Sequence, residues 1–257
     1  MFKKITLIAI LFVLAPGVPA VHADMIPLDK ATQGEGNKGA SFRPWTDASR
    51  TQTVDFVMTA RTGIDETNPL VADATGLAGT VYIDKDGKGG KPRGTGVQTA
   101  SGGGSKGISG GGGDRDEELI FTYDQPVYIS GVTIRLGDIE FGAPGVVDKD
   151  DPVIFLQTVG SPTFNVTLTE SDIFAAFSYI GDPGNKYGEV DFNSFITSAG
   201  LNQNAGLIAF SVRETNGHLY VNGVSSGGGN VVPEPATLAV LACGGMVLVR
   251  RRRRGKA

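Results

Sequence analysis

Ser109 and His218 are the side chains of this sequence that could serve as nucleophile and base in a Ser–His–Asp arrangement. Ser109 stands in Gly107-Ile108-Ser109-Gly110-Gly111, which fits the G-x-S-x-G pattern of a nucleophile elbow. An elbow requires a turn from a strand into a helix, and neither is expected in so glycine-rich a segment. His218 is the one histidine between residues 24 and 232, and it follows Asn216-Gly217, a pair typical of a hairpin turn. We therefore interpret His218 as the start of a strand, and predict no catalytic residue.

Glycine patterns elsewhere give no phosphate site. Gly102–Gly107 fits G-x-G-x-x-G, but that motif binds phosphate only between a buried strand and a helix, and we expect neither here. The segment Gly87–Gly113 contains 13 glycines in 27 residues. So little apolar surface predicts a long surface loop.

Carboxylates could bind calcium at three places in the sequence. Asp84, Asp86 and Gly89 begin as a calcium-binding EF-hand loop does, but position 12 is Thr95 instead of a bidentate glutamate, which excludes an EF-hand. The other candidates are two acidic runs, which consist of Asp114, Asp116, Glu117 and Glu118, and of Asp148, Asp150 and Asp151. We interpret both as solvated loops, with a structural calcium ion that pins a loop of the domain as the alternative.

Other site chemistry is restricted by composition. The only cysteine, Cys243, lies near the carboxy terminus, and one histidine cannot complete a zinc site, so we predict no metal centre and no catalytic cofactor. Trp45 is the only tryptophan. We interpret it as an anchor that holds the amino-terminal arm to the domain, with a sugar-stacking role as the alternative.

The first 23 residues predict export. Lys3 and Lys4 precede the apolar stretch 5–14, and small residues follow up to Ala23, after which cleavage before Asp24 is expected. An uncleaved anchor is the alternative, but ten apolar residues span only about 15 Å as a helix, roughly half of a bilayer core.

The carboxy terminus combines three features. After a Ser/Gly linker over 226–232 come Pro233-Glu234-Pro235, the apolar stretch 236–249 and a basic cluster. The prolines disfavour a helix and leave an accessible protease substrate. The stretch predicts a short transmembrane helix, and the basic cluster predicts that translocation stops with this end in the cytoplasm. The cluster consists of Arg250, Arg251, Arg252, Arg253 and Arg254.

This layout resembles the PEP-CTERM sorting tail, a label that is sometimes shared with the carboxy-terminal domain of ice-binding proteins. The matching residues are Val232, Pro233, Glu234 and Pro235, the apolar stretch and the arginines. The resemblance implies that the general secretion machinery exports the chain and that the tail holds the precursor in the inner membrane. It further implies that an exosortase, a membrane protease, cuts near Pro-Glu-Pro. The exported part of the chain between the two ends (residues 24–232), which we call the body, then passes to the cell surface or beyond. Such systems accompany exopolysaccharide production.

The net charge of residues 24–232 argues against nucleic acid as a partner. Eight of the 23 basic residues and one of the 27 acidic residues lie in residues 1–23 and 233–257, which leaves 15 basic against 26 acidic residues, about −11. A body this acidic disfavours nucleic-acid binding, which needs a positive surface for phosphates.

Residues 51–225 are expected to form strands. Apolar residues recur with period two between glycine, proline, asparagine and aspartate, as in Leu119, Phe121 and Tyr123. We predict a turn at Asp124-Gln125-Pro126 and a bulge near Gly131, and leave 171–180 and 190–196 open between strand and helix. The segment 114–127 also resembles an uncharacterised β-domain that accompanies this sorting tail. The fold class is all-β, an antiparallel sandwich that is jelly-roll-like.

The sequence thus predicts five parts and two possible functions. The parts are a signal peptide (1–23), an amino-terminal arm (24–50), the β-sandwich (51–225), a linker (226–232) and the sorting tail (233–257). The preferred function is a non-catalytic surface or extracellular-matrix protein that is associated with exopolysaccharide. The alternative is a secreted hydrolase acting on polysaccharide, which needs two facing carboxylates, or a carbohydrate-binding module.

Overall fold

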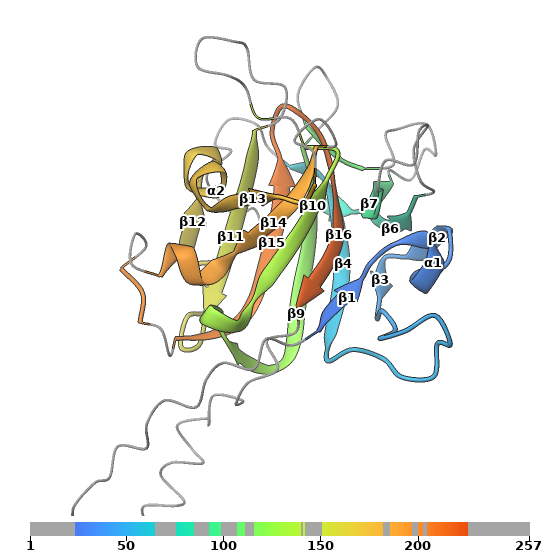
Figure 1. Cartoon of the computed structure of the whole chain (residues 1–257), viewed down its shortest axis with the longest axis horizontal. Coiled ribbons are helices and arrows are strands. Elements are labelled where there is room, and N and C mark those ends of the chain that lie inside the picture. The colour runs from blue at the N-terminus through green and yellow to red at the C-terminus, as the bar shows by residue number, and fades with distance from the viewer. Residues whose placement is uncertain are drawn as a thin grey trace, which may run out of the picture.

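Alternating apolar side chains build two antiparallel sheets whose inner faces pack on each other (Figure 1). The computed structural model describes residues 24–64, 76–84, 93–98, 107–110, 116–139, 141, 151–181, 186–196, 200–202 and 205–225. Over these residues the chain is an all-β sandwich with a few short helical turns, as the sequence predicts.

The larger sheet, sheet A, has nine strands within the described residues, in the order β13-β14-β10-β16-β7-β6-β2, with β1 and β8 also paired to β16. Its strands are Phe177–Tyr179 (β13), Tyr187–Asp191 (β14), Thr133–Gly137 (β10), Gly217–Ser225 (β16), Thr95–Gln98 (β7), Thr80–Ile83 (β6), Gly36–Gly39 (β2), Met25–Pro27 (β1) and Ile108–Gly110 (β8).

The smaller sheet, sheet B, has seven strands in the same part of the chain, in the order β12-β11-β15-β9-β4-β3, with β5 on β4. Its strands are Val166–Leu168 (β12), Pro152–Thr158 (β11), Gly206–Glu214 (β15), Asp116–Tyr128 (β9), Phe56–Ile64 (β4), Ser41–Phe42 (β3) and Leu77–Ala78 (β5). The helical turns are Lys30–Gln33 (α1), Glu170–Ala176 (α2), Ile129–Gly131 (η1) and Phe192–Phe195 (η3).

The core lies between the sheets and is rich in phenylalanine. Leu119, Phe121 and Tyr123 face it from β9, as their spacing predicts, with exposed fractions of 0 to 4%. The Phe121 ring stacks on Phe210 of β15 with centroids 4.4 Å apart, and meets Phe56 of β4 edge-on at 5.8 Å. Three neighbouring strands of sheet B therefore share one aromatic cluster, a favourable packing of rings.

Two predicted turns have a different form in the structure. Asp124-Gln125-Pro126 does not end a strand, because β9 continues to Tyr128, and the residues form an irregularity in the β9–β15 ladder instead. Gly131 ends the 3₁₀ turn η1 between β9 and β10, where a bulge was expected. Both positions do break the regular ladder, but the way in which they break it depends on which strands lie alongside.

The hairpin prediction at Asn216-Gly217 is wrong. β15 and β16 join there, but β15 pairs with β9 and β11 in sheet B, whereas β16 pairs with strands of sheet A. The turn therefore crosses from one sheet to the other. The residue pair favours a tight turn, but it does not require that the flanking strands bond to each other.

The glycine-rich segment also differs from the prediction of one long loop. Its described parts include β7 and β8, and Val97 and Ile108 in these strands are fully buried in the core. Glycine allows the close approach of these strands to β16. A Cβ atom on Gly94 would lie 2.4 Å from the carbonyl oxygen of Val221.

The two ambiguous segments each contain both kinds of structure. Thr169 caps α2 with a capping box that includes Asp172, and β13 follows the helix directly. The second segment begins in β14 and continues as η3, whose first turn is capped by Asp191.

Candidate functional site

Most residues of the predicted signal-cleavage site and sorting tail lie outside the described residues. These are Ala23, Val232, Pro233, Glu234, Pro235, the apolar stretch 236–249 and Arg250–Arg254. Asp24 is described, and it is exposed directly before β1. No helix in the described part of the chain is long and apolar enough to cross a membrane.

Ser109 and His218 come together in the structure, although nothing in their spacing predicts it. They are register partners on β8 and β16, so their side chains leave the same face of sheet A. Ser109 Oγ is buried and makes no hydrogen bond within the described residues. Ser109 also lies inside a strand, not at a strand-to-helix turn. The pair therefore lacks the hydrogen bond that joins a nucleophile to its base.

The His218 ring packs against other neighbours. A Cβ atom on Gly107 would lie 2.4 Å from His218 Nε2, and the ring meets Tyr220 edge-on at 4.8 Å. Its Nδ1 lies 3.9 Å from Asp138 Oδ2, beyond hydrogen-bond distance. Burial lowers the pKa of His218, and the nearby Asp138 carboxylate only partly offsets this.

The candidate calcium ligands that the structure describes are bound to other groups of the protein and do not converge on one point. Asp84 Oδ2 accepts hydrogen bonds from Arg93 Nη1 and from the Tyr220 hydroxyl, each at 2.9 Å. Thr95, the would-be twelfth loop position, lies on β7 opposite Ile83, and Asp84 N–H bonds to the Gly94 carbonyl. Asp86, Gly89, Asp114, Asp148 and Asp150 lie outside the described residues. No cluster among the described residues has the arrangement of a metal site.

The first acidic run is strand, not loop, from Asp116 onward. Glu118 of β9 is fully buried, in a row between Arg61 of β4 and Arg213 of β15, with nitrogen-to-oxygen distances of 3.9 Å to both. Ser211 Oγ donates to Glu118 Oε1 at 2.6 Å. The Arg213 guanidinium also lies over the Phe155 ring at 4.8 Å. This row serves packing inside the protein, because both Glu118 and Arg213 have an exposed fraction of 0%.

Glu117 and Glu214 are facing carboxylates, the kind of pair that a glycosidase requires. They are register partners on β9 and β15, on the inner face of sheet B. Both are at least 98% buried, and they accept backbone N–H groups. Glu117 Oε2 accepts from Ser109, and Glu214 Oε1 accepts from Asp151 and Asn216. Their geometry is that of side chains that hold the backbone of neighbouring segments, β8 and the residues beside β11 and β15, in place.

Trp45 joins the amino-terminal residues to the sandwich. Its ring meets Phe42 edge-on at 5.3 Å and packs on the core, while the Arg50 guanidinium lies over it at 5.4 Å. The Gln33 side chain bonds to both the N–H and the carbonyl of Trp45. The anchoring role that we expect for Trp45 is therefore what its contacts provide.

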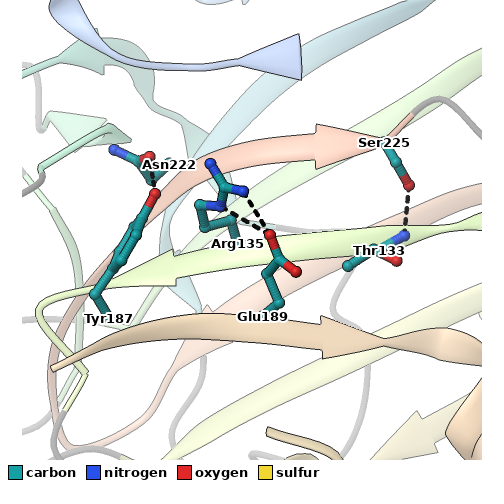
Figure 2. A network of polar contacts seen from close by, with 6 residues as sticks. All are labelled: Thr133, Arg135, Tyr187, Glu189, Asn222 and Ser225. Carbon is teal, nitrogen blue, oxygen red and sulfur yellow. Dashed lines mark hydrogen bonds and ion pairs between the residues drawn. The ribbon is translucent and has the colours of Figure 1, made fainter. Parts of the chain in front are cut away.

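The outer face of sheet A carries a polar cluster whose members are far apart in the sequence (Figure 2). Arg135 of β10 donates from Nε and Nη2 to Glu189 Oε1 of β14, and its guanidinium lies 5.6 Å from the Tyr187 ring. Burial disfavours the charged form of Arg135, but the hydrogen bond to Glu189 and the interactions with Tyr187 and the Glu189 charge together outweigh this and raise the pKa of Arg135. Burial also raises the pKa of Tyr187. We call Arg135, Tyr187 and Glu189 the first unit.

A second group on the same face has the same composition. Arg93 is paired with Asp84, and its guanidinium lies 5.6 Å from the Tyr220 ring. We call Arg93, Tyr220 and Asp84 the second unit. Burial, followed by the hydrogen bond to Asp84, raises the pKa of Tyr220. Each unit thus consists of an arginine, a tyrosine beneath it and a carboxylate.

Asn222 of β16 joins the two units. Its Oδ1 accepts from the Tyr187 hydroxyl at 2.9 Å, and its Nδ2 donates to the Arg93 carbonyl at 2.7 Å. At the other end of the face, Ser225 Oγ accepts from Thr133 N–H (Figure 2). The alternation of Tyr187, Glu189 and Asp191 with Gly188 and Val190 is the sequence pattern that marks this outer face.

No family model, curated protein or solved structure matches this chain.

Proposed function

We propose that this chain is an exported, non-catalytic protein of the cell surface or extracellular matrix. Residues 1–23 direct export, and the exosortase cuts at Val232–Pro235 while residues 236–249 and Arg250–Arg254 hold the precursor in the inner membrane. The observation that carries the proposal is the order of Pro-Glu-Pro, apolar stretch and five arginines.

The arrangement of the sandwich supports this proposal. Its elements run from Met25, two residues after Ala23, to Ser225, seven residues before Val232. The core contacts described above lie within these limits, so both cleavages leave them intact. Consecutive strands such as β9 and β10, or β15 and β16, lie in opposite sheets, which supports a jelly-roll-like connectivity as part of the same proposal.

The alternative of a polysaccharide hydrolase has less support. It requires two carboxylates that a substrate can reach. The facing pair Glu117 and Glu214 is buried and bound to backbone N–H groups. A carbohydrate-binding role without catalysis fits the matrix function.

The test follows the chain in a bacterium with an active exosortase. We expect the body in the surface or culture fraction, with a carboxy terminus within or just before residues 233–235 by mass spectrometry. Replacing Pro233, Glu234 and Pro235 by alanine should leave the intact precursor in the inner membrane. The control Pro162→Ala, in an exposed turn of the sandwich, should be processed as the wild type is. Intact wild-type chain that stays in the membrane of exosortase-active cells would overturn the proposal.

A further inference from the structure

The two units on the outer face of sheet A repeat the same three kinds of group side by side. In each, a guanidinium lies 5.6 Å from a tyrosine ring and bonds to a carboxylate. Asn222 bridges them through both ends of its amide. A duplicated set of groups on one continuous face matches a ligand that itself consists of repeating units.

The groups in the first unit have the chemistry that recognises sugar hydroxyls. Both hydrogen bonds of the Arg135–Glu189 pair use one carboxylate oxygen, Oε1, so the pair itself does not use Oε2 or Nη1. A guanidinium donor beside a carboxylate acceptor matches neighbouring hydroxyls, which both donate and accept. The half-buried Tyr187 ring beside them offers an apolar surface to the C–H face of a sugar.

In the second unit, the arginine is the one group that a ligand can reach. Tyr220 and the Asp84 carboxylate are almost fully buried, whereas 33% of the Arg93 side chain is exposed. His218 and Asp138 lie next to it, with exposed fractions of 30% and 24%. The second subsite therefore consists of the Arg93 guanidinium together with the neighbouring His218 imidazole and Asp138 carboxylate, which sugar hydroxyl groups can reach.

These side chains are held in place before any ligand arrives. Arg135 and Glu189 keep exposed fractions of 28% and 33%, so a ligand can reach them, yet each is fixed by the other. The Tyr187 hydroxyl is fixed by Asn222. Groups that are already ordered lose little conformational entropy on binding, which favours affinity.

We propose that the outer face of sheet A binds a neutral glycan chain, with the first and second units as adjacent subsites. The net charge of the body, about −11, disfavours an anionic polymer. This inference deepens the proposed matrix function, from which it takes its biological setting, but binding itself depends only on the face described here.

The test measures binding of the full-length chain, purified in a detergent without a sugar headgroup, to immobilised polysaccharides by biolayer interferometry. The panel contains a linear β-glucan, an α-glucan, a galactomannan and, as an anionic polymer, alginate. We expect binding to at least one neutral glycan and a weaker response to alginate. Soluble hexasaccharides of the bound glycan should compete about tenfold better than disaccharides, because only the longer chain reaches both subsites.

Two variants and one control locate the site. Arg135→Gln and Glu189→Gln should each weaken binding about tenfold, the loss expected for one charge-assisted hydrogen bond. Arg43→Gln breaks a comparable ion pair, Arg43 with Asp124, outside the two units and should bind as the wild type does. Thermal melts of all three variants identify one that fails to fold. In that case Tyr187→Phe replaces it, because this change keeps the ring and removes the hydroxyl that contacts Asn222 and Arg135, and it should also weaken binding.

The outcomes separate this inference from the proposed function. Any of four results would overturn the proposed glycan-binding subsites. These are no binding to any neutral glycan, stronger binding to alginate, equal competition by short and long sugars, and full binding by folded site variants. None of these results bears on processing at Pro-Glu-Pro, which is measured in cells. Failure of processing with intact glycan binding would overturn only the sorting proposal.

Discussion

Met25 on β1 lies directly opposite Ser225 on β16, so the first strand of the described residues is bonded to the last. β16 also pairs with β10, β7 and β8. Sheet A therefore cannot be completed until the chain has emerged as far as residue 225. The pairing therefore joins the two ends of the part of the chain between residues 25 and 225.

The residues that follow β1 should be important for stability. Leu28 is fully buried, and its N–H bonds to the Asn222 carbonyl at 2.8 Å. We expect Leu28→Ala to lower the free energy of unfolding by about 2–5 kcal/mol, because it removes core contacts and leaves a cavity. Urea denaturation followed by Trp45 fluorescence measures this. Lys30→Ala, at an exposed ion pair, should change the value by less than about 0.5 kcal/mol. An equally small effect of Leu28→Ala would show that β1 is not docked.

Glu118 should be needed to compensate the buried arginine. Glu118→Gln removes the charge that lies between Arg61 and Arg213 and leaves Arg213 with less compensation at an exposed fraction of 0%. Breaking a buried ion pair costs about 3–5 kcal/mol, and we expect a loss of free energy of unfolding near that range. The same urea experiment with Glu35→Gln, at an exposed ion pair, serves as the control. If both glutamate variants were equally stable, the row would have no net stabilising role.

Gly94 should not tolerate a side chain. The Cβ of Gly94→Ala would lie 2.4 Å from the Val221 carbonyl oxygen, a backbone atom of β16 that cannot move alone. We expect a loss of about 1–3 kcal/mol in the free energy of unfolding, as for other overpacked sites. Ser178→Ala, on an exposed part of β13, is the matched control and should be nearly neutral. A Gly94→Ala variant as stable as that control would mean that β7 does not approach β16 this closely.

His218 should make stability depend on pH in a defined direction. The pKa of its imidazole is lowered in the folded state by burial, while an unfolded histidine has a pKa of about 6.5. The unfolded chain therefore takes up the proton first as the pH falls. The contribution of His218 is fully present above about pH 6.5 and is lost as the pH falls toward the folded-state value.

The measurement is the change in free energy of unfolding between pH 8 and pH 5. We expect a smaller drop in His218→Asn than in the wild type, while Ser178→Ala retains the full drop. The groups around residue 218 are the same in the wild type and in both variants, namely Asp138, Arg93, Asp84 and Tyr220. A difference in the drop between His218→Asn and the wild type therefore reports on the histidine. An identical drop in the histidine variant and in the wild type would contradict the lowered pKa.

The strands were predictable where their side chains alternate. Leu119, Phe121 and Tyr123 showed the buried face of β9 in the sequence, because burial on one side of a strand is a local property. Val97 and Ile108 were missed, since short apolar strands among many glycines give no periodic pattern. Asn216-Gly217 gave the position of a turn but not the partners of the strands on either side of it.

The candidate site was not predictable in the same way. Arg135 and Glu189 are 54 residues apart in the sequence, and Tyr187 and Asn222 are 35 apart. Only the neighbouring positions of β14, β10 and β16 bring them together. Ser109 and His218 are a second example, because their pairing depends on the register of β8 against β16.

The sequence by itself determined the all-β class, the faces of the main strands and the acidic body between two basic ends, because these depend on the local order of apolar, charged and turn-forming residues. The tertiary structure alone decided which strands are neighbours, and with that the paired first and last strands, the buried row at Glu118 and the two units of the outer face. The physical reason is that strand pairing uses backbone hydrogen bonds that are the same for every residue type. Partners are therefore chosen by how the whole set of strands packs around one core.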